Sequence, residues 1–149
     1  MLVDNGDLIQ GNPIADYQAA VGSKEGKADP AIKALNAMKY EVGTLGNHEF
    51  NYGLSYLDNV IKQAQFPIVN ANIVKPGTDE PFFQPYFIQE KTIIDANGKP
   101  QSVKSAISAL YHHKLWFGIK QILKAKLKHV ILSKPPKNMC QLLKRRARM

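Results

Sequence analysis

The chain has 149 residues, 44% of them hydrophobic, and a formal net charge of +8. This length suits one domain, and no apolar run is long enough to span a bilayer, so we expect a soluble globular region. The single cysteine, Cys140, excludes an internal disulfide framework. No basic and apolar leader follows Met1, so we expect either a cytosolic protein or a chain whose start is missing.

The basic charge is confined to one part of the chain. Residues 1–104 contain nine lysines, no arginine and all twelve acidic residues, a formal charge of −3, whereas residues 105–149 contain eleven basic residues and no acidic one. We therefore divide the chain near Lys104 into a first piece and a basic tail. The charge of the whole chain is no guide to the partners of the first piece.

The beginning of the first piece is predicted to alternate between strand and helix. An Asn-Pro and an Asp-Pro pair each combine an N-cap residue with proline at the first helical position. The expected elements are a buried strand ending at 2–3, helices over about 13–21 and 30–40, a strand over 42–45, and a helix that starts near Leu54 and ends before Pro67.

The pattern then changes to strands. Residues 66–74 favour one strand, and residues 85–94 are rich in aromatic and β-branched side chains. The Asn97-Gly98 pair is typical of a two-residue hairpin turn, which would lead into a strand over 101–104. The order of elements predicts a mixed α/β fold with helices packed outside sheets.

Two loops contain groups suited to phosphoester cleavage. Two cations roughly 3.5–4 Å apart would neutralise phosphoryl oxygens and activate water near neutral pH. Asp7, at the end of the first strand, is placed to bridge such a pair, and the amide oxygen of Asn47 can bind one ion. His48 can face the phosphoryl group as a proton donor or charge stabiliser.

Each of these residues also has an ordinary interpretation. A Gly-Asp pair commonly forms a turn, and a loop histidine is commonly a hydrogen-bonded surface residue. Asp4 and Glu49 can serve simply as capping or solvated acids. The joint placement of Asp7 and His48, each just after a predicted strand, favours a site.

Asp7 lies within GDLIQG, and Asn47, His48 and Glu49 lie within GNHEFNYG. With FPIVNANIV further on, these motifs resemble the metallophosphoesterase (calcineurin-like) superfamily and its 5'-nucleotidase branch, most of all the periplasmic 2',3'-cyclic-nucleotide 2'-phosphodiesterase/3'-nucleotidase group. The resemblance covers about residues 1–104. It implies a four-layer α/β/β/α domain, hydrolysis of 2',3'-cyclic nucleotides and 3'-nucleotides, a periplasmic parent and two divalent metal ions. It also implies Asp7 as bridging ligand, Asn47 as ligand to one ion and His48 as the catalytic group near the scissile phosphate.

The chain departs from the family pattern in three places. The family's first motif, Asp-x-His, would lie before Met1, and its later histidine motifs and nucleotide-binding domain would lie beyond the region of resemblance. We therefore expect a partial metallophosphoesterase domain, incomplete at both ends. Only Asp7 and Asn47 remain of the expected metal ligands, so we predict incomplete metal occupancy and an inactive isolated chain.

The tail, residues 105–149, allows three interpretations. Apolar residues recur among lysines at helical spacing, which suits a basic amphipathic helix on an anionic membrane, and the run 144–146 would suit nucleic acid. The alternative function is thus a non-catalytic basic interaction protein. A second interpretation is a solvated basic face. The adjacent His112 and His113 would not converge on one metal ion without other ligands.

The third interpretation is a change of reading frame near codon 104. Regrouping the third base of each codon with the first two of the next can yield acidic residues, an apolar strand and an amphipathic helix ending in glycine. That string is similar to what the family has after the hairpin. We favour this interpretation, which predicts that the tail is poorly packed.

Overall fold

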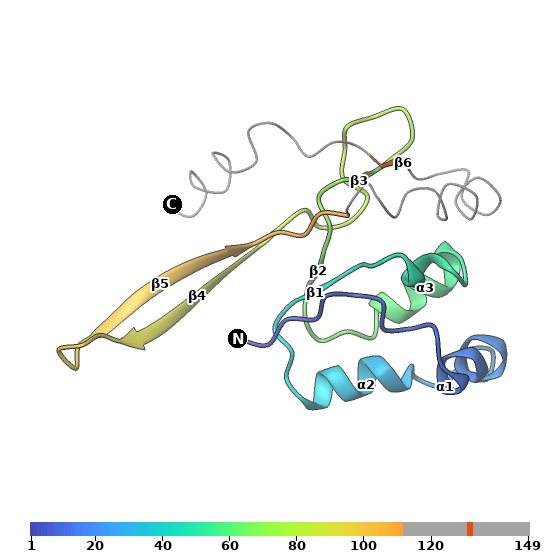
Figure 1. The fold of residues 1–149 in the computed structure, drawn as a ribbon, viewed down its shortest axis with the longest axis horizontal. Helices are drawn as coiled ribbons and strands as arrows, with labels where there is room; N and C mark the ends of the chain where they lie inside the picture. The colour runs from blue at the N-terminus through green and yellow to red at the C-terminus, as the bar shows by residue number, and fades with distance from the viewer. Residues whose placement is uncertain (112–130, 133–149) are drawn as a thin grey trace.

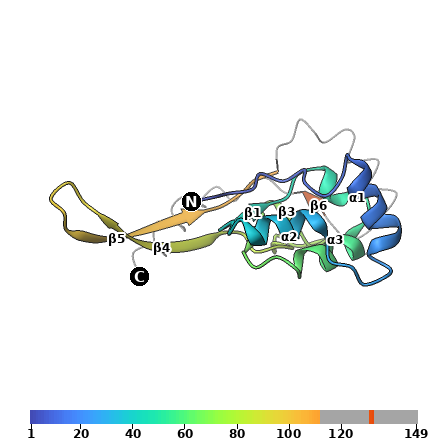
Figure 2. The ribbon, with the colours of Figure 1, turned by 90° about the horizontal axis from the view of Figure 1, so that it is seen from below.

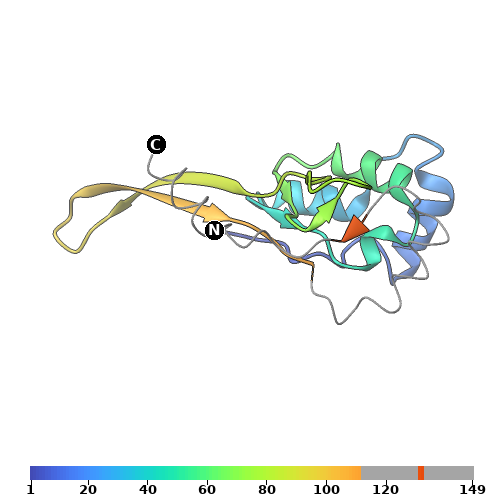
Figure 3. The same cartoon turned by 90° about the horizontal axis from the view of Figure 1, so that it is seen from above.

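A computed structural model of the protein describes residues 1–111 and 131–132. Helices α1, α2 and α3 gather at one end, and the hairpin of β4 and β5 projects from the other (Figure 1). The same separation is seen from below and from above (Figures 2 and 3). The mixed α/β prediction is confirmed. Within the described ranges, no helix has the length and apolar character of a membrane-spanning segment.

A short parallel arrangement forms the centre of the helical end. β1 (Gly43–Thr44) pairs in parallel with β2 (Ile68–Val69). The N-terminal segment runs along the other side of β1, where Asp4 N donates to the carbonyl of Val42 at 3.0 Å. The expected first strand is therefore present as an isolated bridge at Val3. The expectation that it is buried is wrong, because Val3 is 42% exposed on the outer side of this arrangement.

Both predicted proline helices begin where expected. α1 (Pro13–Tyr17) starts after its N-cap Asn12 and continues as a π-helical turn over Gln18–Gly22. α2 (Pro30–Ala37) starts after Asp29, whose carboxylate accepts from two backbone N–H groups of the first turn. This helix ends before the expected residue 40, because Lys39 has φ +56° and cannot continue it.

Helix α3 (Leu54–Ile61) packs its apolar face into the core. Its Tyr56 hydroxyl donates to Asp29 Oδ2 at 3.0 Å, so the side chain that caps α2 also joins the two helices. The buried core cluster joins these helices to the loops and the later strands; its members are Ile9, Ile32, Leu45, Phe50, Tyr56, Leu57, Val60, Ile73 and Tyr111.

The single strand expected over 66–74 is divided into two. After β2 the chain turns at Asn70, whose Oδ1 accepts from the backbone N–H of Asn72 and Ile73. The chain then enters β3 (Ile73–Val74), which pairs antiparallel with β6 (Ile131–Leu132). The apolar residues of this segment favoured one continuous strand. Asn70 is fully buried and forms hydrogen bonds with the nearby backbone, and these bonds interrupt the strand.

The hairpin is longer than the sequence predicted. β4 (Phe87–Ile94) pairs antiparallel with β5 (Pro100–Ile107), from Phe87 opposite Ile107 to Ile94 opposite Pro100. Asp95 N donates to Lys99 O, so the turn is wider than the expected two residues. The Asp95 carboxylate also accepts from the backbone N–H of Asn97 and Lys99, which stabilises the wider turn.

The first residues of the tail are ordered against the body of the protein. β5 runs past Lys104 to Ile107, and Ala109 O accepts from Ala71 N at 2.9 Å. Tyr111 is buried, and its backbone N–H and C=O both bond the Asn72 side chain. The tail was expected to be poorly packed or to form an amphipathic helix, and His112 was considered as a metal ligand. Apart from the residues just described, these expectations concern residues outside the described ranges.

Candidate functional site

A buried glutamate joins the two loops that the sequence singled out. Glu49 is 3% exposed. Its Oε2 accepts from Asp7 N and from Gly46 N, both at 2.7 Å, and its Oε1 accepts from Leu8 N at 2.6 Å. Three backbone donors from two distant segments thus share one carboxylate. We call residues 4–8 and 46–51 the site loops.

Two glycines allow the site loops to approach closely. Gly6 has φ +80°, and a Cβ built on it would lie 2.2 Å from Gly46 N. A Cβ on Gly46 would lie 2.2 Å from Asp7 Oδ1. Because any larger residue would overlap backbone or the carboxylate, the spacing of the loops requires glycine on both sides.

Asp7 occupies a backbone conformation that few non-glycine residues adopt. Its φ is +61°, and its Oδ1 accepts from the backbone N–H of His48 at 2.9 Å. The Glu49 bonds to the loop hold the chain in this left-handed conformation. In the described part of the chain, Asp7 Oδ2 has no protein donor, so one oxygen of an exposed carboxylate is left for a ligand.

The GNHE segment forms a tight 3₁₀ turn over His48–Phe50, with Asn47 as its N-cap. The Asn47 side chain makes no capping hydrogen bond. The His48 ring lies against Asn51, with His48 Nδ1 at 3.1 Å from Asn51 Nδ2. Asp7, Asn47 and His48 are therefore brought together, in agreement with the pairing of loops expected from sequence.

Negative charge gathers at the site loops and affects the neighbouring acids. Partial burial, together with the charges of Glu49 and Asp7, raises the pKa of Asp4 above its ordinary value, although the Gly6 N–H works in the opposite direction. Burial and the charges of Asp7 and Glu49 also raise the pKa of Tyr111. An excess of negative charge of this kind favours cations.

The described residues contain two oxygen groups of a kind that suits divalent cations. Across residues 1–111 and 131–132, no three His, Cys, Asp or Glu side chains converge as metal ligands. The carboxylate of Asp7 and the amide of Asn47 do fit as two oxygen donors for a divalent cation, because they lie on adjoining loops with the Asp7 Oδ2 unpaired in this region.

Sequence reasoning missed two residues of this neighbourhood. Glu49 was expected only to cap or to be solvated, yet it is the buried connection between the loops. Its position between buried Leu45 and Phe50, in a segment rich in glycine, is the signal that could have found it. Tyr111 lies in the tail, where nothing in the sequence associates it with Asp7.

Known proteins share both this sequence and this fold. No protein-family model matches the chain. The 2',3'-cyclic-nucleotide 2'-phosphodiesterase/3'-nucleotidase of Haemophilus influenzae is 72% identical over 104 residues, which are 70% of this chain and 16% of the relative. The enzyme of the same name from Salmonella typhimurium is 58% identical over 104 residues, with the same two shares of 70% and 16%.

The crystal structure of the calcineurin-like phosphoesterase YfkN from Bacillus subtilis superposes on 89% of this chain and 40% of its own, with a TM-score of 0.79 and 45% identity. The chain belongs to the calcineurin-like metallophosphoesterases. The Haemophilus influenzae NAD nucleotidase, with a TM-score of 0.64 over 98% of this chain and 26% of its own, is 22% identical and shares the fold alone.

This metallophosphoesterase chain is much shorter than its relatives. It spans 16% of the length of the Haemophilus and Salmonella enzymes. The structural match to YfkN covers 40% of that protein's chain.

Proposed function

We propose that this chain carries one part of the active site of a metal-dependent phosphoesterase that hydrolyses 2',3'-cyclic nucleotides and 3'-nucleotides. The observation that supports it best is the Glu49-centred connection, which places the backbone N–H of His48 on the Asp7 carboxylate at 2.9 Å. The 72% identity to the Haemophilus enzyme supports the substrate class. A periplasmic parent is part of the same proposal.

The metal-binding part of the proposal rests on two oxygen donors. Asp7 would bind through Oδ2 and Asn47 through its amide oxygen, both of them ligands that suit divalent cations. In a complete site, two divalent cations neutralise phosphoryl charge and lower the pKa of bound water. The chain's own contribution is to hold Asp7 in its left-handed conformation before any ligand arrives, which avoids a reorganisation cost on binding.

His48 is the proposed catalytic residue. Its main chain is fixed by the bond to Asp7, and its ring is fixed by Asn51. A ring held in this way can donate to a phosphoryl oxygen or to the departing oxygen as negative charge develops there.

The isolated chain is expected to be inactive, because two oxygen donors do not hold a pair of cations tightly. The purified 149-residue chain, supplied with Mn²⁺ and bis-p-nitrophenyl phosphate, should release no nitrophenol above the metal-only rate. Metal-dependent release that is lost in an Asp7→Asn variant would overturn the prediction of inactivity.

A chimera tests the proposed function itself. Residues 1–104 of this chain would replace the matching segment of the Haemophilus influenzae enzyme, whose remaining sequence supplies the other ligands. The chimera should hydrolyse 2',3'-cyclic AMP, and Asp7→Asn or His48→Gln in it should lower kcat by roughly 100-fold or more. An Asn97→Ser control at the hairpin turn should keep activity. A folded chimera without activity contradicts the proposal.

We also propose that residues 105–149 were generated by a change of reading frame. The tail has eleven basic residues and no acidic one, and the matches to the Haemophilus and Salmonella enzymes extend over 104 residues. Sequencing the underlying gene decides the matter. A continuous frame whose tail recurs in other proteins would overturn this proposal.

A further inference from the structure

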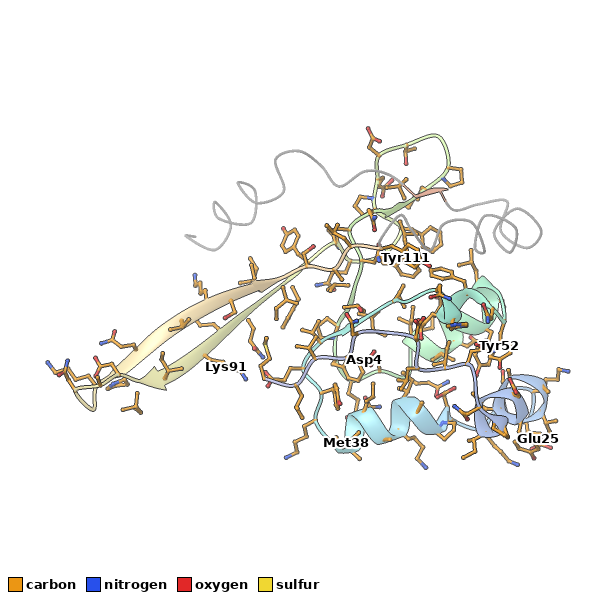
Figure 4. The ribbon with its side chains drawn as sticks, viewed as in Figure 1. Asp4, Glu25, Met38, Tyr52, Lys91 and Tyr111 are labelled. Carbon is orange, nitrogen blue, oxygen red and sulfur yellow. The ribbon has the colours of Figure 1, made fainter. Side chains whose placement is uncertain are left out.

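Tyr111 is a residue of the tail whose side chain lies in the body of the protein, away from the hairpin (Figure 4). It is 7% exposed and belongs to the same core cluster as Ile9, Leu45 and Phe50, which lie in or beside the site loops. The Asn72 side chain holds its backbone, because it accepts from Tyr111 N and donates to Tyr111 O, both at 2.7 Å. The ring therefore has a defined place next to the site loops.

The hydroxyl group of Tyr111 is buried and has no hydrogen-bond partner among the described residues. A hydroxyl buried in this way usually meets a protein partner, a water or an ion, because an unpaired one costs free energy. Its surroundings are acidic: burial and the charges of Asp7 and Glu49 raise the pKa of Tyr111. The hydroxyl is thus within electrostatic reach of both carboxylates of the site loops.

One of these two carboxylates has an oxygen to spare. Glu49 uses both of its oxygens to accept from three backbone N–H groups. Asp7 Oδ1 accepts from His48 N, but Asp7 Oδ2 has no donor in the described part of the chain. The Tyr111 hydroxyl and Asp7 Oδ2 are therefore two oxygen groups of one neighbourhood that do not bond each other. A species held by both would satisfy both.

The local charge favours a cation as that species. Besides Asp7 and Glu49, the partly buried Asp4 lies in the same neighbourhood, and the charges of the other two acids contribute to its raised pKa. A phosphate or another anion would be repelled here, whereas a divalent cation offsets the excess negative charge. A phenolic oxygen has lone pairs to offer to such an ion, and hard divalent cations take oxygen ligands.

We propose that Tyr111 supplies a third oxygen ligand, so that this chain binds one divalent cation through Asp7, Asn47 and Tyr111. The role of Tyr111 rests on the metal-binding part of the proposed function. Tyr111 lies in the tail, outside residues 1–104, so it is not among the ligands that the family resemblance implies. The three oxygen donors come from three separate segments of the chain, two of them the site loops.

Terbium luminescence of the full 149-residue chain tests the proposal without any substrate. Tb³⁺ takes oxygen ligands, and its emission is excited through a tyrosine ring only when that ring lies close to the ion. We expect saturable emission on excitation of tyrosine, lost when Mn²⁺ competes for the site and absent in an Asp7→Asn variant. Wild-type chain that shows no saturable binding of Tb³⁺ or Mn²⁺ would overturn the proposal.

A Tyr111→Phe variant separates a ligand from a structural hydroxyl. It should bind Mn²⁺ roughly 10-fold or more weakly, measured by calorimetry, because one ligand is lost. Without metal its urea midpoint should be unchanged or higher, because only an unpaired hydroxyl is removed. Unchanged Mn²⁺ affinity would overturn the proposal, and so would a metal-free midpoint that falls, since the hydroxyl would then have a partner in the folded protein.

The matched control is Tyr17→Phe. Tyr17 is 54% exposed on α1, so this change should leave the Mn²⁺ affinity and the Tb³⁺ emission nearly as they are. A loss of Mn²⁺ affinity in Tyr17→Phe as large as that in Tyr111→Phe would mean that the effect is not specific to Tyr111, which contradicts its role as a ligand.

The chimera keeps this proposal distinct from the proposed function, because it contains residues 1–104 only and lacks Tyr111. If Tyr111→Phe weakens Mn²⁺ binding to the full chain but the chimera is inactive, the proposed function fails and Tyr111 stands as a ligand. If the chimera is active and Tyr111→Phe binds Mn²⁺ like the wild-type chain, the proposed function stands and the role of Tyr111 is overturned.

Discussion

The site loops and the hairpin, residues 87–107, differ in backbone regularity and in burial. The hairpin has a continuous eight-residue ladder, yet most of its residues are exposed, including Ile94 at 67%. The site loops have almost no regular structure, yet they enclose Glu49 at 3% exposure. Backbone regularity and tight packing are therefore separate properties in this protein.

The difference has a direct physical origin. The hairpin satisfies its backbone groups within its own ladder and needs few contacts with the rest of the chain. The site loops have no ladder, so backbone N–H groups of both loops depend on one buried carboxylate, which is 42 and 41 residues from Asp7 and Leu8 but only three from Gly46. Precise placement of Asp7 and His48 follows from that dependence, which makes the loops sensitive to single changes.

The largest expected effect comes from a pair of glycine substitutions. Gly6→Ala would combine a φ of +80° with a Cβ 2.2 Å from Gly46 N, and it should cost about 3 kcal/mol or more. Gly98→Ala has a similar φ of +74° but nothing within 4 Å, so it should cost about 1 kcal/mol. Urea denaturation of the two variants measures the difference, and equal losses would contradict the contrast between the regions.

A second prediction concerns the buried carboxylate. Glu49→Gln can keep an acceptor for Asp7 N and Gly46 N, but its NH₂ group would then face Leu8 N–H. We expect a loss of about 1–3 kcal/mol and faster hydrogen exchange at the Leu8 amide.

The matched control for this change is Glu80→Gln. Glu80 pairs with Lys75 at 2.6 Å on an exposed surface, where an ion pair contributes little. The Glu80→Gln substitution should leave both the urea midpoint and the Leu8 exchange rate nearly unchanged. If Glu49→Gln behaves like Glu80→Gln, the shared carboxylate does not hold the loops.

Alkaline pH should act on the body through two of its tyrosines. Burial, helped by Asp16, raises the pKa of Tyr52 to about 12, and burial and the Asp29 charge raise the pKa of Tyr56. The ordinary value is about 10, so the stability that these neutral tyrosines contribute is fully present below about pH 10 and is lost as pH rises through the folded values.

Tyrosinate absorbance against pH checks this expectation. Part of the chain's six tyrosines should titrate late and together with loss of tertiary structure, and Tyr52→Phe should remove one late step. Residues 87–107 contain no tyrosine. Titration of every tyrosine near pH 10 in the folded chain would show that the body does not protect them.

The smallest effect is expected where the hairpin meets the body. Lys91 lies on the hairpin (Figure 4). It pairs with Glu41 at 2.6 Å, and this cation is the main cause of a lowered Glu41 pKa. Lys91→Gln should reduce stability only slightly, with a loss that vanishes at high salt, because both partners are solvated. A large loss that persists in salt would mean that the hairpin is firmly coupled to the body.

The sequence predicted the parts of the fold that depend on local chemistry. The starts of α1 and α2 follow from Asn12 and Asp29 before proline, and the hairpin was placed from its Asn-Gly turn. The strand expected over 66–74 was wrong in detail, because the decisive residue, Asn70, bonds its own backbone while fully buried. Local patterns do not reveal whether a polar side chain is buried.

By itself the sequence determined which residue types are available for chemistry: Asp7 after one strand, and Asn47 and His48 after another. Only the tertiary structure decided that Glu49 is the buried connection between them and that Asn51 faces the His48 ring. The physical reason is that hydrogen-bond partners are chosen by position in space. A carboxylate or an amide in a loop becomes structural or catalytic only when the fold brings donors and acceptors to it.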